Sequence, residues 1–259
     1  MTNKPFKINL IPDVPDSTKE EALNPTANLI GQAFRGITHK VLDPLVRYNI
    51  VKDEEMKDFA AKVKQKTSET PLEYRDSSKL GLTLKSVEDS AYQLNSEELR
   101  DMFSSLIAAS VDSRINAKVH PSFSTTLKDL SPDDAKIFKE IYLLGTIPSV
   151  TVRIIEQSSG SGVNIIENIL IMDGYYLQAP ETLNTLSNFG LITISSGTFL
   201  SSTTNKEKYD KFEESDIYLR EKAKLPFYSE DILFDKIEVK KGKVELTPIG
   251  KQFGSIVLS

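Results

Sequence analysis

The sequence predicts an α+β protein, mostly helical, in which an N-terminal helical domain precedes a winged-helix-like C-terminal module. Apolar residues recur at helical spacing as far as about residue 145. Two β-branched segments, 149–155 and 163–172, then indicate strands. We expect an irregular arm over 1–16, a helical domain over 17–130, and a winged-helix-like α+β domain over 131–259 with an insert at 201–235.

The first predicted helix carries a candidate interaction surface. Its start combines a capping asparagine with Pro25 in the first turn, and prolines interrupt the arm before it. Small residues beside its apolar stripe favour close packing against another helix or a partner. A membrane-surface helix is the alternative, but the polar face has few basic residues. The candidate interaction residues here are Pro25, Gly31, Phe34, Arg35 and Gly36.

Further helix starts follow along the N-terminal part. Acidic residues at 53–55 open one helix, and another is expected around 84–93. Asn95 is expected to cap a third helix, in which apolar residues form one buried stripe. The residues of that stripe are Leu99, Met102, Phe103, Leu106 and Ile107.

Two short motifs are interpreted as structural. His120 precedes a proline and a short helix, and no histidine or cysteine stands at metal-ligand spacing from it. A histidine without an orienting partner is a weak general base, so capping or corner packing is the favoured role. The second motif combines a cap, a proline at the first helical position and acids in the first turn. The residues assigned structural roles are His120, Pro121, Phe123, Ser131, Pro132 and Asp134.

The end of the chain suggests the winged-helix order. A helix over 180–189 closes at a glycine, and a strand follows it at 191–194. A helical insert is expected near 207–224. Two short strands, 237–239 and 244–246, then flank a Lys-Lys-Gly-Lys turn, which predicts a hairpin, and a short helix ends the chain.

Composition excludes several kinds of chemistry. The chain has no cysteine, which removes thiolate nucleophiles, disulfides and cysteine-bound metals. The loop Gly160-Ser161-Gly162 lacks the lysine that ends a phosphate-binding loop. Paired acids stand at predicted helix starts, where the helix dipole accounts for them. We therefore expect no catalytic residues, no metal and no cofactor; an enzyme with an unrecognised carboxylate site is the least favoured alternative.

Charge argues against nucleic acid as the partner. The net charge is −5, and the candidate recognition helix over 180–189 contains Glu181 but no lysine or arginine. Only Lys240, Lys241 and Lys243 could hold phosphates. These three lysines also belong to the candidate interaction surface, as a second part of it. We expect a protein partner, with homo-oligomerisation left open, and no specific DNA binding. A secretory signal and a membrane-spanning apolar run are both lacking, so a cytoplasmic protein is expected.

Several motifs together resemble those of the abortive infection alpha family. In the N-terminal part they are Leu10-Ile11-Pro12-Asp13, Asn24-Pro25-Thr26-Ala27 with the following Gly31 to Gly36, Asp43-Pro44-Leu45, Val119-His120-Pro121-Ser122-Phe123 and Leu130-Ser131-Pro132-Asp133-Asp134. Near the end they are Phe189-Gly190-Leu191-Ile192 and Leu246-Thr247-Pro248-Ile249-Gly250-Lys251-Gln252-Phe253. The resemblance covers nearly the whole chain, apart from 146–178 and 201–235.

The resemblance implies a role in bacterial or prophage defence against bacteriophage, in which an infected cell is halted or sacrificed. A modulator that acts on a host anti-phage system for the phage's benefit fits the same resemblance. It implies no reaction. We expect a non-enzymatic protein acting through protein–protein contacts, and the alternative is a winged-helix transcriptional regulator that binds DNA.

Overall fold

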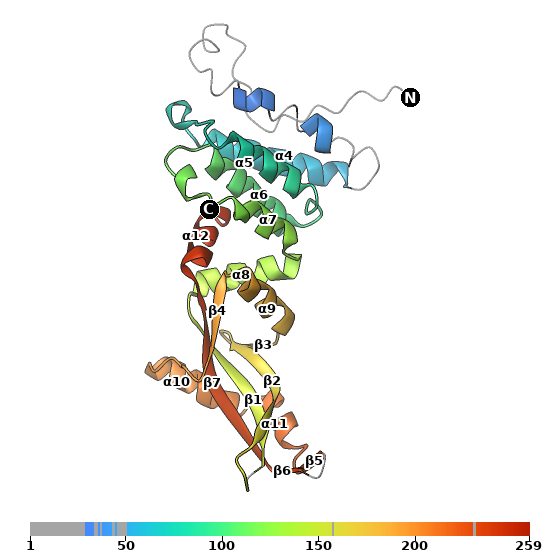
Figure 1. Ribbon diagram of the computed structural model, residues 1–259, viewed down its shortest axis with the longest axis vertical. Helices are drawn as coiled ribbons and strands as arrows, with labels where there is room; N and C mark the ends of the chain where they lie inside the picture. The colour runs from blue at the N-terminus through green and yellow to red at the C-terminus, as the bar shows by residue number, and fades with distance from the viewer. Residues whose placement is uncertain are drawn as a thin grey trace. The chain divides into compact units, whose positions relative to one another are not determined.

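The computed structural model describes residues 29–33, 36, 38–42, 45, 51–156, 158–229 and 232–259. The chain forms two compact units. Unit 1 comprises Met1–Lys136 and Gln252–Ser259, and unit 2 comprises Ile137–Lys251. The predicted order of a helical N-terminal part followed by a sheet-containing part is confirmed (Figure 1).

Unit 1 is built from helices. They are η1 (Thr38–Leu42, a π-helical turn), α4 (Asp53–Ser68), η2 (Leu72–Tyr74), α5 (Leu80–Ser90), α6 (Glu97–Ser110), η3 (Asn116–Lys118) and α7 (Ser122–Asp129). The helices α8 (Pro132–Leu144) and α12 (Pro248–Val257) contribute one end each.

Helix α6 forms the centre of the unit 1 core. It contacts α4, α5 and α7, and all five residues of its predicted apolar stripe are buried. The cap was predicted one residue too early: the Ser96 hydroxyl, and not Asn95, accepts the Leu99 N–H at 3.4 Å. Either residue type can cap a helix, so the register depends on where the turn before α6 ends.

Buried polar contacts join α5 to its neighbours. The hydroxyls of Thr83 in α5 and Ser110 in α6 lie 2.8 Å apart in the core. Asp89, buried at the other end of α5, bonds to Lys85 and to Ser124 of α7. A buried carboxylate is stable only with such partners, so these contacts fix how α5 and α7 pack.

The described residues of unit 2 form a five-stranded antiparallel sheet and a separate two-stranded one. The strands are β1 (Ile147–Ile155), β2 (Gly162–Ile171), β3 (Tyr176–Leu177), β4 (Ile192–Ser196), β5 (Phe227–Ser229), β6 (Ile232–Phe234) and β7 (Lys236–Leu246). The helices are α9 (Pro180–Asn188), α10 (Thr203–Phe212) and α11 (Asp216–Lys222). The sheet order is β3-β2-β1-β7-β4, and β5 pairs with β6.

Helices from the predicted insert cover one face of the sheet. Val150 and Val152 of β1 pack against Tyr209 and Phe212 of α10 and Tyr218 of α11. Helix α9 contacts β2 and β4. Residues 201–235 therefore supply part of the unit 2 core, although the sequence suggested only a charged helical insertion.

The predicted hairpin at the lysine turn is wrong. Residues 236–246 form the single strand β7, and Lys240, Lys241 and Lys243 lie in its middle. β7 pairs with β1 along one side and with β4 along the other, which keeps these residues extended. The winged-helix arrangement depended on that hairpin and is not confirmed.

Gly242 allows β7 to pair closely on both sides. It lies opposite Ser149 of β1 and Ser196 of β4. A Cβ atom at this position would lie 2.6 Å from the Ser195 carbonyl oxygen and 3.0 Å from the Ser149 hydroxyl. The Gly242 carbonyl also accepts the buried Tyr209 hydroxyl at 2.6 Å. Position 242 therefore has no room for a side chain.

We expect Gly242→Ala to destabilise the protein by about 1–3 kcal/mol, the usual cost of overpacking a dense core. Gly81→Ala is the matched control, because an added Cβ there meets no atom within 4 Å and alanine is a better helix former than glycine in this first turn of α5. Its effect should be neutral or stabilising. Urea unfolding of both variants checks this, and equal stability of Gly242→Ala and the wild type would contradict the packing argument.

Candidate functional site

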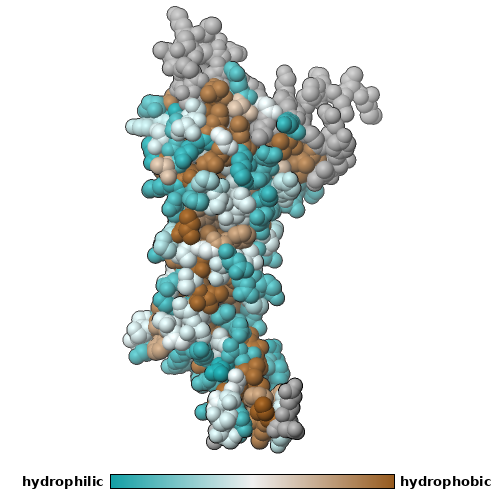
Figure 2. Space-filling model, viewed as in Figure 1, coloured by the Kyte–Doolittle hydropathy of each residue, from teal (hydrophilic) through white to brown (hydrophobic). Residues whose placement is uncertain are grey.

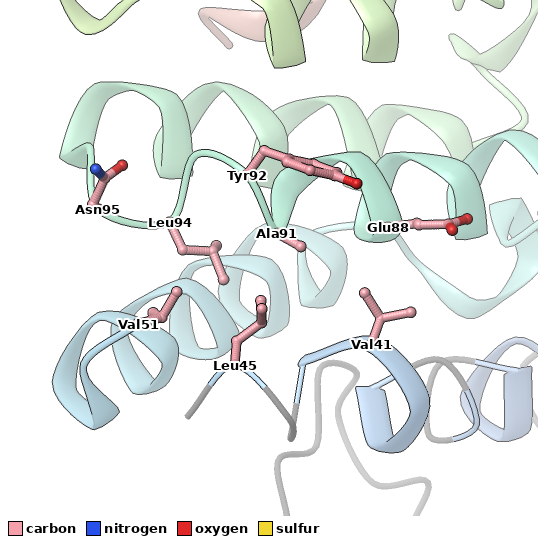
Figure 3. Close-up of a pocket in the computed structure, with 8 residues that line it drawn as sticks. All are labelled: Val41, Leu45, Val51, Glu88, Ala91, Tyr92, Leu94 and Asn95. Carbon is pink, nitrogen blue, oxygen red and sulfur yellow. The ribbon is translucent and has the colours of Figure 1, made fainter. Parts of the chain in front are cut away.

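An apolar pocket of about 500 Å³ opens in unit 1. It lies between the link from η1 to α4 and the link from α5 to α6 (Figure 3). The lining residues are Val41, Leu45, Val51, Glu88, Ala91, Tyr92, Leu94 and Asn95.

The pocket has an apolar floor and a polar rim. In Figure 3 Val41, Leu45 and Val51 lie opposite Ala91 and Leu94. Val51 and Leu94 are buried, and the Val51 N–H donates to the Leu45 carbonyl at 3.3 Å, which holds that side of the pocket. This arrangement suits an apolar side chain of a ligand or partner.

Tyr92 stands at the rim of this pocket with 71% of its surface exposed. Its ring lies 5.3 Å from the Lys128 ammonium group, which orients the aromatic face. An exposed tyrosine beside an apolar pocket is typical of protein-binding surfaces. Sequence reasoning missed this site; the signal was the run of Ala91, Tyr92 and Leu94 in a short link between two helices.

The structure describes only some of the residues that were predicted to form an interaction surface on the first helix. Pro25, Phe34 and Arg35 lie outside the described residues. Gly31 is half-buried and Gly36 is exposed. Val41 and Leu45, which lie further along the chain, line the pocket.

Two of the three lysines predicted to hold phosphates are engaged within unit 2. The Lys241 ammonium lies 2.8 Å from the Asp210 carboxylate and 5.4 Å from the centre of the Tyr209 ring. The Lys243 ammonium lies 2.8 Å from the Glu245 carboxylate. Lys240 is exposed. Pairing with acids lowers the positive potential that this strand offers to an anion.

His120 lies two residues before the first residue of α7. Its Nδ1 accepts the Ser122 N–H at 3.2 Å and lies 2.7 Å from the Ser122 hydroxyl. The ring also lies 5.8 Å from that of Phe123, which is buried and packs edge-on against Phe253 at 5.2 Å. The ring nitrogen thus accepts a backbone N–H at the start of α7, and the ring itself packs beside Phe123.

Several carboxylates are used to start helices. At α8 the Ser131 hydroxyl accepts the Asp134 N–H at 3.1 Å, and Asp134 accepts the Ser131 N–H at 2.9 Å. Pro132 is the first residue of that helix. At α4 the Glu55 carboxylate accepts the Lys52 N–H at 3.0 Å. The two contacts at α8 are reciprocal, as in a capping box, whereas the contact at α4 runs only from the backbone to the carboxylate. Within the described part of the chain, no group of three or more His, Asp or Glu residues could hold a metal ion.

Asp112 is a buried carboxylate that the sequence did not indicate. It binds the Arg114 guanidinium through both oxygens, with a shortest contact of 2.5 Å, and accepts the Thr70 hydroxyl at 3.3 Å. The Arg114 hydrogen bonds hold the pKa of Asp112 below its ordinary value, although burial opposes this shift. Asp112 also lines a small polar opening of about 220 Å³ beside Lys66.

A second exposed apolar surface lies in unit 2. Figure 2 shows apolar residues gathered at the end of unit 2 where β5 and β6 lie in Figure 1. The large exposed side chains of this hairpin are Phe227, Tyr228 and Ile232. The sequence had marked this segment only as part of an insert.

Comparison with protein families identifies the chain. A model of the family described as abortive infection alpha matches residues 51–257. The chain belongs to the abortive infection alpha family. The match confirms the resemblance and includes the motifs around His120, Ser131 and Thr247, while those at 10–13, 24–27 and 43–45 precede it.

Other comparisons add little to the abortive infection alpha assignment. No curated protein matches the chain. One similar solved structure is an uncharacterized protein from the marine bacterium Alcanivorax borkumensis SK2, at 14% identity and a TM-score of 0.33, covering 53% of this chain and 92% of that one. A similarity this low carries no argument. Among the described residues, no helix has the length and apolar character needed to cross a bilayer.

The Asp112 ion pair predicts a pH-dependent difference in stability. A lowered pKa in the folded state stabilises the fold above the unfolded pKa of about 3.9, and this contribution is lost as pH falls through the folded pKa. We expect Asp112→Asn to lose about 1–3 kcal/mol at pH 7, the cost of a buried group deprived of its charged partner.

The test compares urea unfolding of wild type and Asp112→Asn from pH 7 to pH 3. Their difference should shrink below about pH 4, as the wild-type carboxylate becomes protonated. The control is Asp173→Asn, because Asp173 pairs with Lys208 at the surface and should contribute less than about 1 kcal/mol. A difference for Asp112→Asn that stays constant over this range would refute the ion-pair explanation.

Proposed function

We propose that this protein acts in abortive-infection-type defence against bacteriophage, or modulates a host anti-phage system, through contacts with a protein partner. The observation that carries the proposal is the family match over residues 51–257. The family's description concerns abortive infection and specifies no reaction.

Two surfaces support contact with a protein. The pocket beneath Tyr92 offers an apolar recess with an exposed aromatic residue at its rim. The β5–β6 hairpin exposes Phe227 and Tyr228. Exposed aromatic residues beside apolar recesses are typical of the energetically dominant parts of protein interfaces.

We further propose a non-catalytic mechanism. Three carboxylates have identified structural partners: Glu55 and Asp134 cap helices, and Asp112 binds Arg114. A carboxylate that caps a helix or forms an ion pair already has a structural role that accounts for its presence. This argument favours binding over the alternative of an unrecognised carboxylate enzyme.

The transcriptional regulator has less support than a protein-binding role. The DNA-binding alternative required a basic hairpin. The corresponding residues lie within the single strand β7, and Lys241 and Lys243 are paired to acids. Helix α9, the candidate recognition helix, carries Glu181 in its first turn, where a phosphate would otherwise be favoured.

A pocket-filling substitution tests the protein-contact proposal. We expect Ala91→Trp to fill the recess with its ring, abolish partner recovery and lose the effect on phage plaque formation. The control is Ala117→Trp, since Ala117 is exposed in η3 and does not line the pocket. Circular dichroism and unfolding curves establish that both variants fold.

The assay compares a gene deletion complemented with wild type or with each variant. Wild type should change the number of plaques at least about tenfold, downward for defence and upward for a modulator that helps the phage. Affinity purification from infected and uninfected cells measures partner recovery. The proposal fails if deletion changes neither plaque number nor survival, or if folded Ala91→Trp keeps both partner and effect.

Nucleic acid binding gives a separate prediction. Each phosphate contact requires a cation, and pairing with Asp210 and Glu245 competes for two of the three lysines. At physiological salt we expect no sequence-selective duplex binding tighter than the micromolar range typical of non-specific association.

Fluorescence anisotropy with fragments from the gene's upstream region, at low and physiological salt, provides the measurement. Lys240→Glu serves as the comparison, because Lys240 is exposed and its reversal should remove the weak binding that low salt allows. A sequence-selective complex in the nanomolar range would favour the regulator instead.

A further inference from the structure

Strand β2 has an open outer edge in unit 2. In the sheet order β2 lies between β3 and β1, but β3 pairs only with Leu170 and Ile171. Among the described residues, no strand pairs with the outer side of 162–169. Val163 and Ile165 in this segment have 55% and 37% of their surface exposed. An open edge with exposed apolar side chains is a template for another strand.

The hydrogen-bond pattern shows which backbone groups face outward. The Glu156 N–H donates to the Ser161 carbonyl at 2.8 Å, so this pair is hydrogen-bonded between the two arms of the hairpin. Bonded and non-bonded pairs alternate in antiparallel strands. Asn164, opposite Arg153, is therefore a non-bonded pair with β1. The N–H and C=O of Asn164 point toward the open edge.

The first part of this edge lacks two of the features that usually protect an edge strand, a lysine and a proline. Natural edge strands avoid pairing through lysine, proline or bulges. Residues 162–166 contain neither a charge nor a proline. The register shift between Val152 and Arg153 leaves Ile165 without a direct partner on β1, which is a bulge. This bulge limits regular pairing to a few residues around Asn164.

We propose that two copies of this chain associate by antiparallel pairing of their β2 edges about a two-fold axis at Asn164. This register places Asn164 opposite itself, so that each copy donates its N–H to the other's C=O. Val163 of each copy then lies beside Ile165 of the other, and Gly162 lies beside Ile166. The contact is self-complementary, as a two-fold interface must be, and brings no charged residues of 162–166 together.

The short paired segment sets the expected strength of association. A few backbone hydrogen bonds and two apolar pairs bury far less area than stable dimers do, so a micromolar dimer is expected. Self-association at this edge is independent of the defence role, and of the pocket in unit 1.

Cysteine cross-linking tests the register directly. The chain has no cysteine, so Asn164→Cys can form a disulfide only with a second copy. Directly opposed residues in a bonded antiparallel pair lie about 5.5 Å apart at Cα, within the disulfide range. Under mild oxidation we expect a disulfide-linked dimer. Thr193→Cys, exposed on the other edge strand β4, is the control and should stay largely monomeric.

Sedimentation equilibrium provides the second measurement. The apparent mass of the wild type should rise with concentration toward that of a dimer. Ile165→Lys should remain monomeric at concentrations at least tenfold higher than those at which the wild type dimerises. Its circular dichroism spectrum should match that of the wild type. Ile165 is exposed, so this variant should fold. A wild type that stays monomeric at several hundred micromolar overturns the proposal, as does a dimer unaffected by Ile165→Lys. Cross-linking of Asn164→Cys no faster than that of Thr193→Cys also overturns it.

Discussion

Strand β7 pairs on both sides at Gly242, and much of unit 2 is arranged around that contact. On one side β7 pairs with β1 from Ile155 to Ile147, and on the other with β4. Both neighbouring strands come so close to Gly242 that a Cβ atom has no room there. The Tyr209 hydroxyl bonds to the Gly242 carbonyl, and thereby ties α10 to the centre of the sheet. The insert over 201–235 consequently belongs to the core and is no peripheral decoration.

In unit 1, buried polar groups specify how the helices pack. Asp89 joins α5 to α7, and Asp112 holds Arg114 and Thr70 close to the end of α6. Such contacts add little net stability, but breaking one leaves a buried group without a partner. They therefore discriminate between alternative helix packings that an apolar interface alone would tolerate. The recognition surface proposed for this unit is instead apolar, at the pocket below Tyr92.

The sequence was informative where the signal is local and poor where pairing is long-range. Helix starts at Asp53 and Pro132 and the buried stripe of α6 follow from capping chemistry and from a period of 3.6 residues. The prediction of a hairpin at 240–243 was wrong because Lys-Lys-Gly-Lys has the composition of a hairpin turn. Only pairing with β1 and β4, which are distant in the chain, holds it extended. The pocket was likewise invisible, since Val41 and Leu94 approach each other only through the fold.

These features together indicate what kind of recognition the protein can support. Lys241, Lys243 and Arg114 are all committed to acids within their own unit, so long-range electrostatic steering by these groups is weakened. A partner that binds these cationic groups would have to break their existing ion pairs. Replacing one exposed ion pair by another gains little free energy. Apolar burial at the Tyr92 pocket and at the β5–β6 hairpin carries no such competition. Recognition through shape and apolar contact, and not through charge, is the mode that this distribution of side chains favours.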